Sequence, residues 1–212
     1  MTLTRETTEF FDSRLIEVAT ALRREFIFLI SDTAPDQIRG LAVVLDADGA
    51  SLWPAVLRRS DLDELEADRR ARRAEDETPD RDWELHWRWH PEAWPRSSAA
   101  APNEDADSLA KTWSELVERR HQVSGSDEAY WPSVLFESAA SAMAVLFQDG
   151  FFDDYPHAHQ VVRVLDDPGA TQIRAEDELR WISNCNNSVG TTSFKAARAQ
   201  HLTGIREPLL GH

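Results

Sequence analysis

The chain has 212 residues, which is enough for one domain with a sizeable hydrophobic core. Its 38 acidic and 23 basic residues give a formal net charge of −15 at pH 7. This charge argues against a general nucleic-acid or anionic-membrane surface, because both need clustered positive charge. Since Cys185 is the single cysteine, an internal disulfide and a zinc site built from several cysteines are excluded.

The first part of the chain predicts a helix, a β-hairpin and a second helix. Over residues 5–30, apolar side chains recur at spacings of three and four, which is typical of an amphipathic helix. Residues 38–46 are apolar at both sets of alternating positions, which predicts a strand covered on both faces. A turn with the sequence Asp-Ala-Asp-Gly leads to a second strand over 51–57, where Pro54 indicates an edge or a bulge. A helix follows from Ser60 to about Ala74.

Two segments interrupt this pattern with charged or small residues. The charged insertion at about 68–82 is expected to form the end of a solvated helix and a loop. The small and acidic residues at about 97–107 predict a flexible acidic loop. Both segments lie outside the hydrophobic core in this prediction.

Between these segments, residues 82–89 alternate large apolar side chains with charged ones. This alternation predicts a strand with one indole-rich face and one charged face. The apolar face would carry Trp83, Leu85, Trp87 and Trp89, and the charged face Glu84, His86 and Arg88.

The second part of the chain predicts helices over 108–123 and from about Pro132 to Gln148, where Gly150 ends the second one. A strand at 160–165 follows, and the remaining elements are a short helix at 175–183, a polar loop at 184–190 and a last helix at 192–201. The element order αββαβααβα indicates an α+β (mixed α/β) fold, a single layered domain over 1–212 with a sheet of about four to five strands packed against helices.

The beginning of the chain shows no signal-peptide pattern, and no apolar run approaches the ~20 residues that span a bilayer. We therefore expect a cytoplasmic protein without a membrane span.

His157 and His159 are the strongest candidates for metal chemistry. On an extended backbone their rings would lie ~7 Å apart on one face, with Asp153 and Asp154 just before them. Two histidines and a carboxylate could supply part of the ligand set of a zinc or non-haem metal site. However, the intervening Tyr-Pro pair indicates a turn, and no third ligand is specified. We favour loop histidines that enter a strand.

Other chemistry has little support in the sequence. There is no Gly-x-Ser-x-Gly motif and no glycine-rich phosphate loop. Cys185 follows a predicted helix C-terminus, where the helix dipole raises a thiol pKa, so we expect it to be inert. The polar run from Asn184 to Ser188 favours a structured loop over a ligand site, because asparagine stabilises tight turns. No catalytic residue and no cofactor are predicted.

Among the eight tryptophans, Trp94 and Trp131 are each followed by proline in or beside predicted loops. An exposed tryptophan beside acidic and arginine residues has the composition of an interface hot spot. A half-buried tryptophan that clamps a loop is the favoured alternative. Trp94 is the aromatic residue that we select as a candidate partner contact.

The segment Trp89-His-Pro-Glu-Ala-Trp94 resembles a Trp-x-Pro-x-x-Trp segment of a bacterial family known only as a domain of unknown function. The likeness covers about residues 10–187 and includes Trp53–Ala55, Phe147–Gly150 and the two aspartates at 166–167. The acidic insertions depart from the family pattern. The resemblance implies no catalytic residues, and it implies a kinship with proteins found beside toxin systems, where small acidic proteins act as immunity proteins.

The leading hypothesis is a non-catalytic acidic binding protein, most plausibly an immunity protein that occludes a basic surface of a cognate toxin. The candidate partner-binding residues are Glu75, Asp76, Glu77, Asp80, Trp94, Glu104, Asp105 and Asp107. Direct binding to nucleic acid or membrane is not expected. One alternative is a ligand-binding or scaffold domain lined by Trp87, Trp89 and Trp94. A weaker alternative is a metal-dependent hydrolase that uses His157 and His159 with Asp153 or Asp154.

Overall fold

The computed structural model describes residues 5–46, 48–72, 83–91, 94–97, 104–124, 131–164, 180, 182–184, 186 and 188–206. Its elements in chain order are α1 (Arg5–Ile30), β1 (Ile38–Leu45), β2 (Leu52–Arg58), α2 (Arg59–Arg72), α3 (Trp83–Arg88), β3 (Arg96–Ser97), α4 (Glu104–Ser124), α5 (Trp131–Gln148), β4 (His159–Val164) and α7 (Ser188–Arg206). Short 3₁₀ turns at Pro35–Gln37 and Phe151–Asp154 precede β1 and β4.

The four strands form one mixed sheet in the order β3-β2-β1-β4. β1 and β2 form the expected antiparallel hairpin, and β4 runs parallel to β1 with Gly40 opposite His159. Pro54 lies opposite Val43, just outside the two residues of β2 that pair with β3. Strand β3 therefore does not pair with β2 at this proline. The predicted α+β fold, a four-stranded sheet packed against helices in a single domain, is confirmed.

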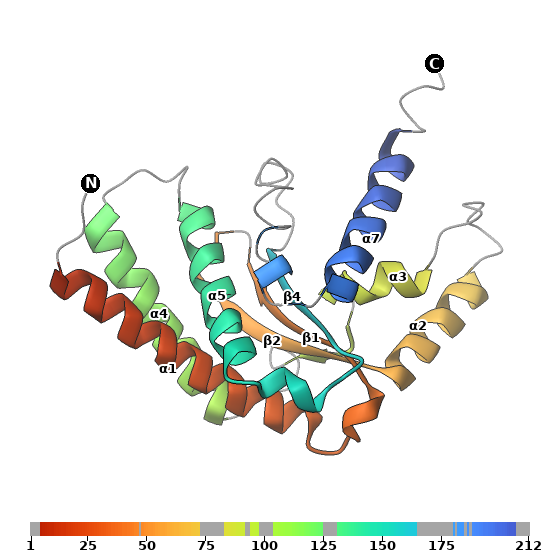
Figure 1. Cartoon of the computed structure of the whole chain (residues 1–212), viewed down its shortest axis with the longest axis horizontal. Coiled ribbons are helices and arrows are strands. Elements are labelled where there is room, and N and C mark those ends of the chain that lie inside the picture. Colours follow the sequence, from red (N-terminus) through yellow and green to blue (C-terminus); the bar gives the residue numbers. More distant parts are fainter. Residues whose placement is uncertain are drawn as a thin grey trace.

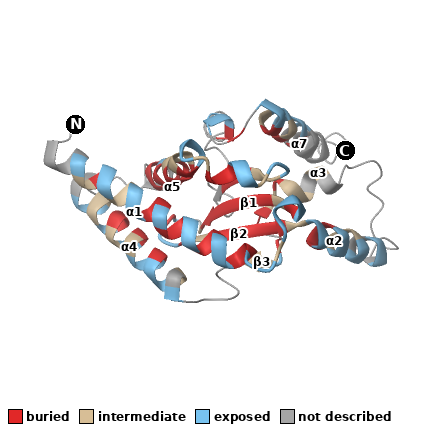
Figure 2. Ribbon diagram, turned by 60° about the horizontal axis from the view of Figure 1, so that its bottom comes forward, coloured by how far each residue is buried: buried red, intermediate tan, exposed pale blue. Residues whose placement is uncertain are grey.

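Helices cover both faces of the sheet, so the molecule has three layers (Figure 1). One core lies between the sheet and α1, α4 and α5, and the other lies between the sheet and α2, α3 and α7. Strand β1 contributes to both cores, because Leu41, Val43 and Leu45 face the first and Ala42 and Val44 face the second. Figure 2 shows β1 buried along its length. The expectation of a strand covered on both faces is confirmed.

The long periodic helices begin and end close to where the sequence predicts. α1 covers residues 5–30 as expected, and Val18, Leu22 and Phe26 on its apolar stripe have no exposed surface. α5 ends at Gln148, and Gly150 follows with a φ of +73°. This left-handed backbone conformation is accessible to glycine without strain, which explains the helix stop.

The predicted strand at 82–89 is wrong, because residues 83–88 form helix α3. In a helix, residues four apart share a face, so Leu85 and Trp89 can turn toward the core together. Trp89 is buried, and Leu85 and Trp87 pack partly buried against the second core. α3 contacts α2 and α7 instead of joining the sheet. In this short segment, tertiary packing overrides the alternating pattern.

Three boundaries also differ from the predictions. The predicted flexible loop at 97–107 is wrong over 104–107, because α4 already begins at Glu104. Carboxylates in a first turn stabilise a helix through its dipole, so the acids of this segment favour helix over loop. α7 begins at Ser188 and extends to Arg206, so the predicted polar loop ends earlier and the last helix is longer than expected. Residues 98–103, and most of the charged insertion at 68–82 from residue 73 onward, lie outside the described part of the chain.

None of the helices that the structure describes is long and apolar enough to cross a membrane.

Candidate functional site

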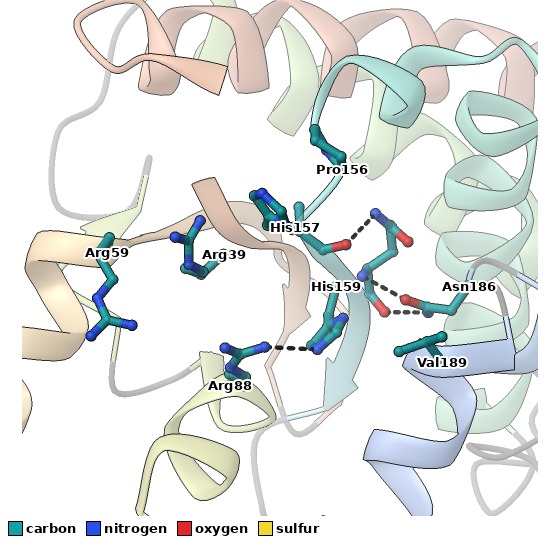
Figure 3. Close-up of a pocket in the computed structure, with 10 residues that line it drawn as sticks. Arg39, Arg59, Arg88, Pro156, His157, His159, Asn186 and Val189 are labelled. Carbon is teal, nitrogen blue, oxygen red and sulfur yellow. Dashed lines mark hydrogen bonds between the residues drawn. The ribbon is translucent and has the colours of Figure 1, made fainter. Parts of the chain in front are cut away.

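A pocket of about 390 Å³ opens where the parallel strands β1 and β4 begin. Its walls come from the amino end of β1, the first residue of α2, the last residue of α3, the turn before β4 and the first turn of α7. The described residues that line it are Arg39, Arg59, Arg88, Pro156, His157, Ala158, His159, Gln160, Asn186 and Val189. Figure 3 shows the three arginines on one side of His159 and Asn186 and Val189 on the other.

The pocket is cationic although the whole chain is strongly acidic. Arg39, Arg59 and Arg88 each come from a different element, and none of the lining residues that the structure describes is acidic. Arginine stays protonated at any physiological pH, so the three guanidinium groups carry three positive charges. The three arginines line this pocket in a chain whose formal net charge is −15.

Two of the arginines, Arg39 and Arg59, contact groups close to them in the sequence. Arg39 Nη1 donates to the backbone oxygens of Asp36 at 2.6 Å and Ile38 at 3.2 Å, which are neutral acceptors. Arg59 Nε lies 3.5 Å from the Asp63 carboxylate, and both side chains are well exposed. An exposed ion pair of this kind is weak because water and salt screen it.

The start of α2, which carries Arg59, is fixed by a buried carboxylate. Asp61 has no exposed surface, and its Oδ2 accepts the backbone N–H of Arg58 at 2.8 Å. Its carboxylate also accepts the Arg58 guanidinium, with Nε at 2.9 Å from Oδ1. A side chain at the third helical position that reaches back to the residue before the helix is one half of a capping box. This contact sets the point where the chain turns from β2 into α2.

The third arginine, Arg88, is oriented by His159. Arg88 Nη1 lies 3.2 Å from His159 Nε2. Because arginine can only donate, His159 Nε2 must be the acceptor, and the proton of the neutral ring is on Nδ1. The His159 ring stacks on Trp89 with centroids 5.1 Å apart and an angle of 8° between the planes. Trp89 Nε1 donates to Ser193 Oγ at 3.1 Å, which links this stack to α7.

Burial, and then the positive charge of Arg88, lower the pKa of His159 from its ordinary value of 6.5 to about 4. His159 is therefore neutral at physiological pH and can accept the Arg88 proton. A carboxylate in its place would orient Arg88 equally well but would cancel its charge. The neutral imidazole positions the Arg88 guanidinium without placing a negative charge beside it.

Asn186 anchors the beginning of β4. It is buried, its Oδ1 accepts the Gln160 N–H at 2.9 Å, and its Nδ2 donates to the carbonyls of Gln160 at 2.7 Å and Ile182 at 3.0 Å. A Cβ on Gly190 would come 2.9 Å from Asn186 Oδ1, so glycine is needed for this packing. The amide of Asn186 is used in structural contacts, which supports the expectation that this polar run stabilises the backbone.

The predicted pair His157 and His159 does line one pocket, but no third metal ligand is among its described lining residues. Asp153 and Asp154 are exposed on the 3₁₀ turn and are not among the described lining residues. Across the described ranges, no group of three or more His, Cys, Asp or Glu residues could hold a metal ion. The neighbouring arginines would also repel a cation, so the geometry lends no support to the metal-dependent alternative. Cys185 lies outside the described residues.

The predicted partner-binding residues are not brought together in the described part of the chain. Glu75, Asp76, Glu77 and Asp80 lie outside it. Glu104 and Asp107 are exposed at the start of α4, and Asp105 belongs to the same helical turn.

Only 5% of the surface of Trp94 is exposed, so its selection as an exposed partner contact is wrong, and the favoured alternative of a tryptophan that clamps a loop agrees with the structure. Its Nε1 donates to the Trp87 carbonyl at 2.7 Å, and a Cβ on Gly40 would come 2.4 Å from its ring. The six-membered part of the ring lies against β1 at Gly40, where a side chain would leave no room for it. Trp94 is thus a clamp between a loop and the core, and its buried indole cannot anchor a partner.

The arginine cluster leaves no local pattern in the sequence. Residues 39, 59 and 88 are twenty and twenty-nine positions apart, and they converge because β1, the β2–α2 junction and α3 meet beside the start of β4. The feature of the sequence that points to this pocket is the pair of histidines, which follows a Tyr-Pro turn at the beginning of an apolar strand.

Comparison with protein-family models, curated proteins and solved structures finds no match to this chain. The resemblance to the family with the Trp-x-Pro-x-x-Trp segment remains a prediction that rests on the residues named above.

Proposed function

We propose that this protein binds a small anionic ligand in the pocket lined by Arg39, Arg59 and Arg88. The observation that carries the proposal is that three arginines from three separate elements line one cavity beside two histidines. The cavity volume of about 390 Å³ falls within the range of ~300–1,000 Å³ that is usual for small-molecule sites.

The electrostatics support an anion in particular. A hydrogen bond between a guanidinium and an ionised oxygen contributes about 1.5–3 kcal/mol, roughly twice as much as a neutral one. The acidic surface of the chain would repel an approaching anion, but this repulsion is screened beyond about 8 Å at physiological ionic strength. Three guanidinium groups line the pocket itself.

A ligand-binding domain was one of the alternatives that the sequence left open, but the residues that line the pocket differ from those expected. Trp87, Trp89 and Trp94 were expected to line a ligand site. Trp89 and Trp94 belong instead to the second core and Trp87 packs against it, and none of the three is among the described lining residues. Trp89 supports the site indirectly, because it stacks under His159 and thereby holds the acceptor of Arg88.

Isothermal titration calorimetry with phosphate, sulfate and citrate, in a buffer free of other multivalent anions, tests the proposal. The full chain should bind at least one of these anions saturably with a one-to-one stoichiometry. Arg59→Gln should weaken this binding about tenfold, since it removes one charge-assisted contact. Arg70→Gln is the matched control, because Arg70 lies exposed on the same helix outside the pocket.

Two results would contradict anion binding at this site. The first is the absence of saturable binding to all three anions. The second is an equal loss of affinity in Arg59→Gln and Arg70→Gln, which would point to a diffuse charge effect.

A second candidate function is the binding of a basic protein partner, such as the toxin of an immunity pair. The net charge of −15 and the exposed Glu104 and Asp107 support it, and it places the chain in the cytoplasm. Co-purification from the native host at low and at high salt tests it. We expect one stoichiometric basic partner that is released as salt rises. Recovery of no partner at either salt would count against it.

A further inference from the structure

The outer side of α1 carries much of the exposed apolar surface of the protein. Of the five large hydrophobic residues that are exposed in the described part of the chain, three lie on this helix, namely Ile16, Ile27 and Phe28. Eleven residues separate Ile16 from Ile27, which brings them to within about 20° of the same line along a helix. We propose that this side of α1 is the surface through which two copies of the chain form a symmetric dimer.

This surface lies away from the pocket. Helix α1 packs with α4 and α5 on one face of the sheet, whereas α2, α3 and α7 cover the other face and contribute to the pocket walls (Figure 1). Figure 2 shows exposed positions that recur along α1. The proposal therefore goes beyond anion binding and is tested separately from it.

The charged residues on the outer side of α1 are segregated along the helix. Between residues 12 and 28, the exposed charged residues are Asp12 and Glu17 in the first half and Arg23 and Arg24 in the second. Glu25, the acidic residue of the second half, has no exposed surface. This side of the helix is therefore acidic at one end and basic at the other, and it is neutral as a whole in a chain of net charge −15.

Glu17 and Arg24 are both accessible to a partner. Arg24 is exposed, and no ion pair joins it to another residue in the part of the chain that the structure describes. Glu17 contacts Arg14, but Arg14 also lies 3.0 Å from Glu115 of α4, so one positive charge is shared by two carboxylates. The Glu17 side chain remains 47% exposed. It can therefore accept a second basic partner, and Arg24 can donate to an acidic one.

A twofold axis beside Thr20 makes this arrangement self-complementary. In an antiparallel pair of helices related by such an axis, each edge of the contact surface meets the same edge of the other copy. Glu17 and Arg24 share one edge, because they lie about 20° apart around the helix. Along the helix, Glu17 of one copy then lies about 1.5 Å from the level of Arg24 of the other copy. Since the axis repeats the contact, each dimer gains two such ion pairs.

The same axis brings the exposed isoleucines together. Ile16 of one copy lies about 4.5 Å along the helix from Ile27 of the other, which is within reach of two branched side chains. Each dimer therefore covers four isoleucine side chains, and this burial supplies the hydrophobic part of the association. A different protein as partner would not require the charges of α1 to complement each other, so their segregation favours a second copy of this chain.

The surface is small, so the dimer should form only at high protein concentration. From Asp12 to Phe28 the helix is about 24 Å long, and its diameter with side chains is about 10–12 Å. The resulting contact of roughly 250 Å² per copy is well below the ~800 Å² per partner that is usual in stable complexes. At physiological ionic strength the Debye length is about 8 Å, so repulsion between the other acidic surfaces is largely screened, whereas ion pairs in contact persist.

Sedimentation equilibrium of the full chain tests the proposal, at about 0.15 M salt and at protein concentrations from about 10 µM to about 1 mM. The average mass should rise from that of one chain toward that of two. Ile27→Ser should weaken dimerisation about tenfold or more, because the change acts twice in each dimer. Val189→Ser is the matched control and should change nothing, since Val189 is 70% exposed but lies on α7.

Reversal of single charges tests the arrangement of the two helices. In a dimer of Glu17→Arg, two arginines face each other, and in a dimer of Arg24→Glu two glutamates do, so each variant alone should dimerise at least about tenfold more weakly. A mixture of the two variants should recover dimerisation, because both contacts then join opposite charges. A fluorescent label on one variant detects the mixed dimer, and circular dichroism shows that each variant is folded.

Four results would overturn the proposal. The first is a chain that stays monomeric over the whole concentration range, and the second is equal dimerisation of Ile27→Ser and Val189→Ser. The third is undiminished dimerisation of either charge-reversed variant alone. The fourth is a mixture that associates no better than its components, which would exclude the antiparallel contact between Glu17 and Arg24. None of these results affects the proposal of anion binding.

Discussion

His159 provides a quantitative test of the site, because its low pKa must make the folded protein less stable in acid. The pKa is about 4 in the folded state, against an ordinary value of 6.5 that applies to the unfolded chain. A depressed histidine pKa means that the unfolded chain takes up a proton first as the pH falls. The contribution of His159 to the free energy of unfolding is thus fully present above pH 6.5 and is lost as the pH falls from 6.5 to 4.

The magnitude follows from the interval of pH that is crossed. Each unit of pKa difference corresponds to 1.36 kcal/mol, and as the pH falls from 6.5 to 5 the excess of protons on the unfolded chain over the folded state rises from about half a proton to nearly one. The free energy of unfolding should therefore fall by about 2 kcal/mol between pH 7 and pH 5 through His159 alone. In His159→Gln this part of the decrease should disappear, while the contribution of every other titrating group remains.

Urea denaturation followed by circular dichroism measures this difference at both pH values. His157→Gln is the matched control, because His157 is exposed on the turn next to His159. Between pH 7 and pH 5, the free energy of unfolding of His157→Gln should fall by about 2 kcal/mol more than that of His159→Gln. The reasoning is refuted if His159→Gln and His157→Gln show the same pH dependence, or if the ring of His159 titrates near pH 6.5 by NMR.

Three further predictions concern the contacts that build the site, and urea denaturation measures each. Gly40→Ala should destabilise the fold by about 1–3 kcal/mol, because its Cβ would come 2.4 Å from the buried ring of Trp94. Asn186→Ala should cost about 1–3 kcal/mol, because it leaves buried backbone groups at the start of β4 without their partner. Asp61→Ala should cost about 3 kcal/mol, because it leaves the N–H and the guanidinium of Arg58 without their shared acceptor.

Each of these predictions has an internal control. Trp94→Phe should reduce the cost of Gly40→Ala, since a smaller ring leaves room for the added carbon, and strict additivity of the two changes would contradict the clash. Asn184→Ala, on an exposed residue of the same polar run, should change stability little. Asp63→Ala, on an exposed carboxylate of the same helix as Asp61, should do the same. If Asn184→Ala and Asp63→Ala destabilise the fold as much as Asn186→Ala and Asp61→Ala do, the named contacts are not the cause of the lost stability.

The long elements of the fold could be predicted because their patterns repeat over several turns. The apolar residues of α1 and α5 recur at helical spacing over several turns, which fits a helix and not a strand. Strand β1 is apolar on both faces because helices cover both sides of the sheet. α3 was missed because six residues are too few for a period to decide. Alternate tryptophans and leucine fit one strand face and also fit a short helix whose packing is set by α2 and α7.

The candidate site could be predicted only where its residues are neighbours in sequence. His157 and His159 form a visible pair, and their placement in one pocket follows from the turn into β4. The arginines could not be predicted, because their juxtaposition depends on how β1, α2 and α3 meet. The metal hypothesis was attractive while the histidines were considered alone, and it loses its support once three guanidiniums stand beside them.

The double burial of β1 has a consequence for the dynamics of the molecule. Strands flank β1 on both sides and its side chains enter both cores, so its amides can meet solvent only when the helical layers separate. The amide protons of residues 41–45 should therefore exchange with deuterium at the rate set by global unfolding. The pocket opens beside the first residues of this strand, so its floor belongs to the slowest-exchanging part of the protein.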